Sequence, residues 1–236
     1  MTPRRFLSLF AAVTLALTAC ATTTTAETST PDTPRAIVVN SGTGSVTVTA
    51  ADSGISVTAA INSAEDPPWS AETVGNEYVI DDGCDGIEDC EVDLVIEVAG
   101  TADVTVNSES GPVTIADMNS SVTVVGAASN VLLNGITGPI NIDITSGDVL
   151  GARLVSTVAS FNTGSGDLDV TLTEVFESLT VTSASGDVKA QVPGGGYDID
   201  ATTSDGEVEI DVDDVDGAAA KITMTTGSGD VTIYRR

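Results

Sequence analysis

The sequence contains no histidine, and aromatic residues make up only 3% of it. Without histidine, a serine nucleophile lacks its usual base, which excludes catalysis of the serine–histidine type. Aromatic rings that could stack on sugars are few, and Trp69 is the only tryptophan. This shortage weakens the case for a polysaccharide-cleaving enzyme, although carboxylates for that chemistry are abundant.

Lysine and arginine are scarce as well. Eight of them stand against 35 acidic residues, which gives a formal net charge of -27, and the only lysines are Lys189 and Lys221. Nucleic acid and anionic membrane surfaces are therefore poor partners for the folded domain. Such a surface stays soluble in salt and attracts cations, which suits a saline habitat.

The first nineteen residues have the three parts of an export signal. Arg4 and Arg5 form a basic tip, and an apolar stretch over residues 6–17 follows, too short to span a bilayer as a permanent helix. The ending LTAC at residues 17–20 resembles the bacterial lipobox, in which the cysteine sulfur receives a diacylglyceryl group. The resemblance implies a lipoprotein with acyl chains such as palmitate at Cys20. We expect export and a membrane anchor in the cell envelope, facing the periplasm or the exterior.

The rest of the chain divides by composition. Residues 20–35 hold the lipidated cysteine, many threonines and two prolines without apolar periodicity, which predicts a tether. Beyond it, abundant valine, threonine, aspartate and glycine favour strands and tight turns. We expect an N-terminal β region with a disulfide hairpin over residues 36–103 and a repeat region over residues 104–236.

The chain has three cysteines. With Cys20 used by the lipid, Cys84 and Cys90 remain as a pair in an oxidising compartment, which indicates a disulfide. The short loop that it closes is worth about 2 kcal/mol in the chain-entropy model. Metal binding by the two thiols is the weaker alternative, because no histidine or further cysteine exists to complete a site.

Seven short segments share one pattern, in which small polar residues precede a glycine and an apolar residue lies two positions after it. They are NSGTGSVT at 40, NSESGPVT at 107, DITSGDVL at 143, NTGSGDLD at 162, TSASGDVK at 182, TTSDGEVE at 202 and TTGSGDVT at 225. Their turn glycines are Gly44, Gly111, Gly147, Gly166, Gly186, Gly206 and Gly229. The last five glycines are 19, 20, 20 and 23 residues apart, which is a real period.

Apolar and acidic residues alternate in the runs between these turns. Val92, Leu94 and Ile96 form one such series, and Val208 and Ile210 begin another, so one face is buried and the other is wet. One unit cannot bury its own apolar face, but stacked units form a continuous core. We predict an all-β fold, a β-solenoid like a single-stranded β-helix with SGD turns. The alternative is an antiparallel β-sandwich whose hairpins share a turn motif.

The SGD turn followed by VxV or VxI, after an export signal, resembles the bacterial putative-adhesin domain of unknown function. It is also similar to the head domains of putative autotransporter adhesins. The segment CEVDLVIEVAGTADVTVNSESGPVTI at residues 90–115 carries the resemblance best, and the resemblance extends over residues 36–234. It implies a β-helix-like fold on the cell envelope and supplies no catalytic or binding residues.

Calcium is the one metal that the sequence suggests, and no other cofactor is expected. Two acidic runs could supply its oxygen ligands. The first offers Asp81, Asp82, Asp85 and Asp89 in the disulfide loop, and the second offers Asp211, Asp213, Asp214 and Asp216. Neither run has the ligand order of an EF-hand or of the glycine-rich calcium repeat, and most acidic runs are solvated loops.

A row of acids follows the turn glycines. Its members are Asp148, Asp167, Asp187, Glu207 and Asp230. In stacked repeats they would lie about 5 Å apart at one edge. At that spacing, like charges repel by about 1 kcal/mol in water. We hypothesise that bound or condensed cations relieve this repulsion.

These features predict a lipid-anchored envelope protein that works by binding, such as adhesion, or by structure rather than by catalysis. Its ligand on the envelope or surface is not identified by the sequence. The alternatives are a polysaccharide-active β-helix enzyme, a calcium-dependent surface-binding module and a sensor module. An enzyme needs carboxylates that converge in a cleft, whereas a scaffold has them spread along its edges.

Overall fold

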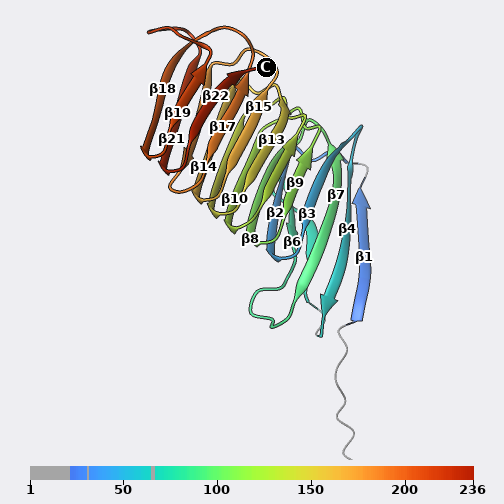
Figure 1. Ribbon diagram of the computed structural model, residues 1–236. Coiled ribbons are helices and arrows are strands. Elements are labelled where there is room, and N and C mark those ends of the chain that lie inside the picture. Colours follow the sequence, from blue (N-terminus) through green and yellow to red (C-terminus); the bar gives the residue numbers. More distant parts are fainter. Residues whose placement is uncertain (1–21, 31, 65–66) are drawn as a thin grey trace, which may run out of the picture.

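The computed structural model describes residues 22–30, 32–64 and 67–236. The described chain folds into two eleven-stranded β-sheets that face each other along an elongated body (Figure 1). Among these residues, no helix is long and apolar enough to cross a membrane. The expected export signal and the lipidation site at Cys20 lie outside the described residues.

We call the first sheet sheet A, and its order is β1-β4-β7-β3-β9-β11-β13-β15-β17-β22-β19. Its strands are β1 (Thr22–Thr30), β3 (Val46–Ala51), β4 (Ile55–Ser63), β7 (Glu91–Ala99), β9 (Val113–Ala116), β11 (Val131–Asn134), β13 (Val149–Leu154), β15 (Leu168–Leu172), β17 (Val188–Val192), β19 (Val208–Asp211) and β22 (Val231–Arg235).

The second sheet, sheet B, has the order β20-β18-β21-β16-β14-β12-β10-β8-β2-β6-β5. Its strands are β2 (Ala36–Thr43), β5 (Ser70–Val74), β6 (Glu77–Asp81), β8 (Asp103–Ser110), β10 (Val122–Ala128), β12 (Ile140–Ser146), β14 (Val158–Ser165), β16 (Ser178–Ser183), β18 (Gly196–Asp205), β20 (Asp213–Asp214) and β21 (Lys221–Ser228).

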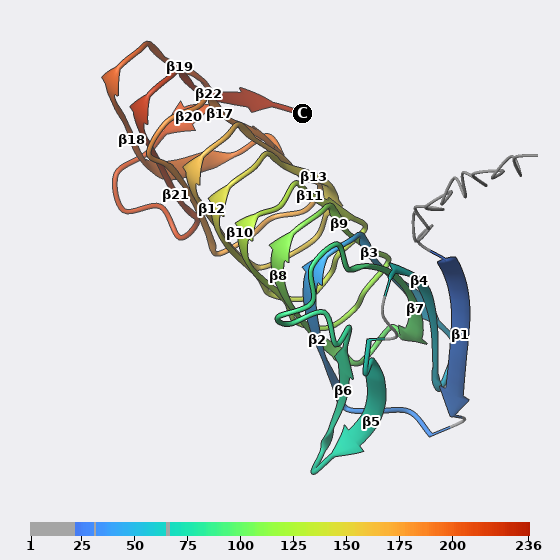
Figure 2. The ribbon, with the colours of Figure 1, turned by 90° about the horizontal axis from the view of Figure 1, so that it is seen from below.

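One layer of the stack consists of a strand of sheet B, a tight corner and a strand of sheet A (Figure 2). Strands of adjacent layers pair in parallel and in register, so that Val104, Val122 and Ile140 stack directly in β8, β10 and β12. All three side chains are buried, because alternate residues of each strand point between the sheets. The prediction of an all-β solenoid is confirmed, and parallel pairing rules out the antiparallel sandwich for this stack.

The last two layers are not in chain order. The final strands β21 and β22 insert between the layer of β16 and β17 and the layer of β18 and β19. The inserted layer and the outermost layer have the same inward residue types in sheet A. These are Val231 and Ile233 in β22, and Val208 and Ile210 in β19. Either layer could therefore occupy either place by side-chain pattern alone. The 23-residue spacing before Gly229 provides the chain for this return.

The N-terminal region belongs to the same stack. Strands β2 and β3 pair in parallel with β8 and β9, and the later strands β6 and β7 add a layer on their other side. The boundary expected between residues 103 and 104 therefore does not divide the sheets. Antiparallel strands close this end: β4 pairs with β7 in sheet A, and β5 pairs with β6 in sheet B.

The threonine-rich segment differs from the expected tether. Thr22–Thr30 form β1, which pairs antiparallel with β4 along the whole segment. Threonine favours strands over flexible coil, and the edge of β4 offers backbone partners that a free spacer would lack. Most of the segment predicted as a spacer therefore extends sheet A.

Candidate functional site at the disulfide corner

The turn glycines line up at the corner that joins sheet B to sheet A. A Cβ at Gly166 would lie 2.1 Å from the carbonyl oxygen of Gly147, and one at Gly186 would lie 2.2 Å from that of Gly166. Gly166 and Gly186 also have φ angles of 135° and 136°, which disfavour any side chain. Glycine at these corners lets successive layers approach closely enough to stack.

The stack contains a corner that the repeat pattern misses. Strands β10 and β11 are joined through Ser129 and Asn130, which take the places of the turn glycine and the following acid. The carbonyl oxygen of Ser129 lies 2.2 Å from where a Cβ of Gly147 would be. The substitution of serine for glycine concealed this layer from a search for the SGD motif.

The acids after the turn glycines form the expected row, and backbone groups stabilise it. In each step, the side-chain oxygen of one layer accepts a hydrogen bond from the backbone N–H of the next layer. The steps are Asn130 to Asp148, Asp148 to Asp167, Asp167 to Asp187, Asp187 to Asp230 and Asp230 to Glu207, at 2.8 to 2.9 Å. Each of these donors stabilises the side-chain oxygen that it meets, and so reduces the repulsion that we expected cations to relieve.

A row of inward hydroxyls lies beside the same corners. Thr226 donates to the carbonyl oxygen of Gly186 at 2.9 Å, and Ser183 donates to that of Gly166 at 3.1 Å. Ser41 occupies the equivalent position in β2, three residues before Gly44. Its hydroxyl oxygen is buried and has no hydrogen-bond partner among the described residues.

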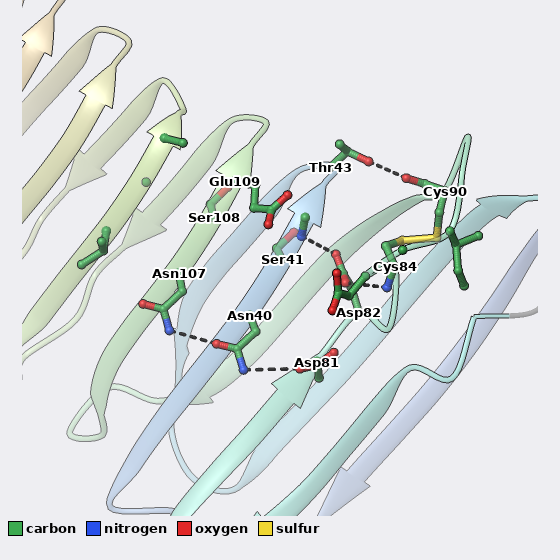
Figure 3. Close-up of a pocket in the computed structure, with 17 residues that line it drawn as sticks. Asn40, Ser41, Thr43, Asp81, Asp82, Cys84, Cys90, Asn107, Ser108 and Glu109 are labelled. Atoms are coloured by element: carbon green, nitrogen blue, oxygen red, sulfur yellow. Dashed lines mark hydrogen bonds between the residues drawn. A yellow bond between two sulfur atoms is a disulfide. The ribbon is translucent and has the colours of Figure 1, made fainter.

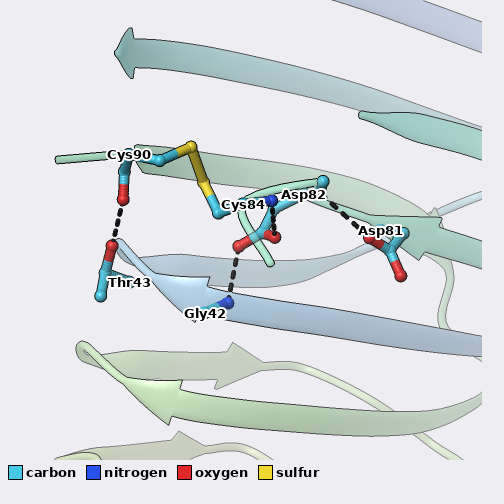
Figure 4. Close-up of a disulfide and its surroundings, with 7 residues drawn as sticks. Gly42, Thr43, Asp81, Asp82, Cys84 and Cys90 are labelled. Atoms are coloured by element: carbon cyan, nitrogen blue, oxygen red, sulfur yellow. Dashed lines mark hydrogen bonds between the residues drawn. A yellow bond between two sulfur atoms is a disulfide. The ribbon is translucent and has the colours of Figure 1, made fainter. Parts of the chain in front are cut away.

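The environment of Ser41 differs because a wide loop replaces the tight corner in the neighbouring layer. Residues 82–90, which we call the disulfide loop, connect β6 to β7. Cys84 and Cys90 are joined within it by a disulfide (Figure 4). The loop swings out from the stack, and Val92, at the start of β7, takes the place of the turn glycine in this layer: its carbonyl oxygen lies 2.4 Å from where a Cβ of Gly44 would be.

Asp82 fixes the start of the disulfide loop. The residue is only 4% exposed, and its two carboxylate oxygens accept backbone hydrogen bonds from Gly42 at 2.6 Å and from Cys84 at 2.9 Å (Figure 4). At the other end of the loop, the Thr43 hydroxyl donates to the carbonyl oxygen of Cys90. Both ends of the loop are therefore held against β2.

The loop overhangs the outer face of sheet B and encloses a pocket of about 650 Å³ (Figure 3). Asn107 donates to Asn40 at 2.9 Å, and Asn40 donates to Asp81 at 3.4 Å, so the amides form a chain along one wall. Ile87 of the loop and Val125 of β10 supply apolar surface. Ser41 also lines the pocket, although its hydroxyl oxygen is buried.

The charge of the pocket restricts its ligand. Asp81, Asp85 and Glu109 line it, and no lysine or arginine does. Amide and carboxylate oxygens provide many hydrogen-bond acceptors. A cationic or an uncharged hydrogen-bonding ligand fits this lining, whereas an anion would be repelled.

Sequence reasoning missed Asn40, Ser41 and Asn107 as pocket residues. Neither their hydrogen bonds nor their place beside the disulfide loop shows in the sequence pattern.

The calcium clusters expected from the sequence are not formed. Among the residues that the structure describes, no group of three or more carboxylates, cysteines or histidines is placed to hold a metal ion. In the first run, the carboxylates of Asp81 and Asp82 bind backbone N–H groups. In the second, Asp214 accepts from the backbone of Ile199 at 3.3 Å, and Asp211, Asp213 and Asp216 are exposed. The two runs lie at opposite ends of the stack.

The fold is shared with a protein of known structure. A putative adhesin from Bacteroides fragilis superposes with a TM-score of 0.51 at 11% sequence identity, covering 90% of this chain and 97% of that one. A putative cell adhesion protein from Clostridium sporogenes gives a TM-score of 0.38 at 10% identity, covering 91% and 100%. A search of curated proteins found no match.

A family model supplies the closer relationship. The model described as Toastrack DUF4097 matches residues 33–234, which span the strands of both sheets from β2 to β22. This range agrees closely with the extent of the resemblance to the putative-adhesin domain of unknown function. The chain belongs to the Toastrack DUF4097 family.

Proposed function

We propose that this protein is a lipid-anchored binding module of the bacterial cell envelope, which engages a cationic or uncharged surface ligand at the disulfide corner without catalysis. The observation that carries the proposal is the pocket beneath the disulfide loop, with its chain of amides and its acidic lining. The Bacteroides fragilis protein of similar fold is named a putative adhesin, which supports a binding role.

The distribution of carboxylates favours binding over hydrolysis. Glycoside hydrolysis needs two carboxyl groups that flank one bond. Here the acids of the corner row are spread along an edge, each bonded to the next layer. Of the carboxylates that line the pocket, Asp82 has both oxygens bonded to backbone donors, and Asp81 accepts from Gly83 and Asn40. A polysaccharide-active enzyme is therefore the weaker proposal.

The binding site can be tested on living cells by photo-crosslinking. A photoreactive amino acid is placed at Val125, which lines the pocket and is 45% exposed, or at Leu150, which is 49% exposed on sheet A. We expect a crosslinked product that appears with the Val125 probe and not with the Leu150 control. Identical products from both positions, or recovery of this chain and lipid alone, would contradict a ligand at the corner.

The anchor is tested separately. Because the cysteine sulfur is the lipid attachment point in lipobox substrates, Cys20→Ser should move the protein from the membrane fraction to the soluble or secreted fraction. Cys84→Ser is the matched control, and it should leave the protein in the membrane fraction. Unchanged fractionation of Cys20→Ser would refute the anchor without bearing on the pocket.

A further inference from the structure

The stack ends at the layer of β18 and β19 without a cover over sheet A. In the two preceding layers, Val188 and Val231 occupy one inward position and are fully buried. Val208 occupies the same position in β19 and is 43% exposed. The next inward position repeats the contrast, with Ile233 buried and Ile210 39% exposed.

The backbone of β19 is open on the same side. The N–H of Val231 donates to the carbonyl oxygen of Glu207 at 2.9 Å, so the backbone groups of Glu207 point toward β22. Successive residues of a strand turn their backbone groups to opposite sides. Those of Val208 and Ile210 therefore point away from β22, where sheet A has no further strand in the described chain.

The outward side chains of this edge all carry negative charge. They belong to Glu207, Glu209 and Asp211, and all three are exposed. Acids on an edge strand discourage pairing with another acidic edge. A second copy of this chain is a poor occupant, because its eight basic residues stand against 35 acidic ones. The charge selects a basic partner.

We propose that β19 is a docking edge for an extended segment of a partner protein in which apolar and basic residues alternate. The segment adds a strand to sheet A through the free backbone groups of Val208 and Ile210. Its apolar side chains cover these two residues, and its lysines or arginines lie beside Glu209 and its acidic neighbours. This edge is at the opposite end from the disulfide corner, so the proposal does not depend on a ligand there.

The test uses the full chain in detergent and a fluorescent peptide, KVKVKVK, with binding followed by anisotropy. Two further peptides carry N-methyl groups, one on the lysine amides and one on the valine amides. A strand bonds to its neighbour through alternate residues only, so one methylated peptide should bind at least about tenfold more weakly and the other nearly as well as the parent. Equal affinities of the two would overturn strand addition.

Protein variants locate the site. Ile210→Pro removes a free N–H that makes no bond inside the sheet, and it should weaken binding at least about tenfold. Glu209→Gln should weaken binding severalfold, whereas the matched Glu97→Gln, on the covered strand β7, should not. An equal effect of the two glutamate variants would show that the acidic surface as a whole attracts the peptide. Tight binding of the acidic peptide EVEVEVE would show that charge does not select the partner. Either result would overturn the proposal. If Ile210→Pro does not fold, the methylated peptides still decide.

Discussion

The two ends of the stack are built differently. At the N-terminal end, β4 pairs with β7 in sheet A and covers its edge. The inward residues of β4, Ile55, Val57 and Ile61, are nearly or fully buried. At the C-terminal end, β19 leaves Val208 and Ile210 partly exposed. Antiparallel strands close one end of the stack (Figure 1). A disulfide links the loop at that end, and the other end is left as an acidic edge.

This difference shows two ways to terminate a solenoid. Stacked layers leave an apolar face and a row of backbone groups at each end, and these must be covered or protected. Antiparallel strands cover them at the N-terminal end. At the C-terminal end, acids on the edge strand keep like copies apart while leaving the edge accessible. Substitutions at matched positions should therefore cost much more at the first end than at the second.

The largest contrast is expected from a charge placed on the inward face of each end. Val57→Asp puts a carboxylate where the side chain is fully buried, and it should lower the free energy of unfolding by about 4 kcal/mol or more. Val208→Asp should lower it by at most about 1 kcal/mol, because solvent reaches the side chain. Urea denaturation of both variants measures this, and equal losses would mean that the C-terminal end is covered in solution.

A smaller contrast is expected from the carboxylates that bind backbone groups in the two end layers. Asp82→Ala leaves the N–H groups of Gly42 and Cys84 without their acceptor and should cost about 3 kcal/mol. Asp214→Ala removes one long, exposed bond to Ile199 and should cost less than about 1 kcal/mol. Denaturation midpoints check the pair, and a larger loss for Asp214→Ala would reverse our assignment of the closed end.

Removal of the disulfide should have an intermediate effect confined to the N-terminal end. The double variant Cys84→Ser/Cys90→Ser removes the link across the disulfide loop, and it should lose about 2 kcal/mol of stability. The C-terminal end has no cysteine that could form a comparable link. A reducing agent should lower the stability of the natural protein by a similar amount and leave the double variant unchanged. A loss in the double variant under reduction would point to another cause.

Much of the stack could be predicted from the sequence, because its corners require particular residues. The steric demand at Gly166 and Gly186 leaves glycine as the residue that fits, so the period shows in the chain. The pairing of Cys84 with Cys90 followed from counting cysteines. The layer through Ser129 was missed, because its corner carries serine in the place of glycine, and Ser129 is not at positive φ.

The order of the last layers and the pocket could not be predicted in the same way. The inward residues of β19 and β22 are alike, so the pattern does not say which layer is outermost. The pocket depends on Ser41 and the neighbouring Asn40, which resemble other polar residues before a turn glycine. Their surroundings differ because the disulfide loop replaces a tight corner in the neighbouring layer. That layer comes later in the chain, since Asn40 of β2 pairs with Asp81 of β6, 41 residues further on.

The smallest predicted effect concerns the one aromatic contact near the C-terminal end. Tyr197 stacks on Phe176 with ring centroids 5.3 Å apart, and its hydroxyl donates to the carbonyl oxygen of Pro193 at 2.6 Å. Burial raises the pKa of Tyr197 above its ordinary value of 10.0. Tyr197→Phe removes the hydrogen bond and should cost about 1 kcal/mol at pH 8.

This cost should shrink at high pH. Below pH 10.0, the ordinary pKa, Tyr197 keeps its proton in both states, so its contribution is present in full. As the pH rises further, the unfolded state loses the proton first, and the natural protein loses stability until the folded-state pKa is passed. Phenylalanine has no such loss, so the difference between the two proteins should narrow between pH 9 and pH 11. Urea denaturation across that range measures the difference, and a constant or growing gap would show that the hydroxyl is open to solvent and that this part of the C-terminal end is not closed.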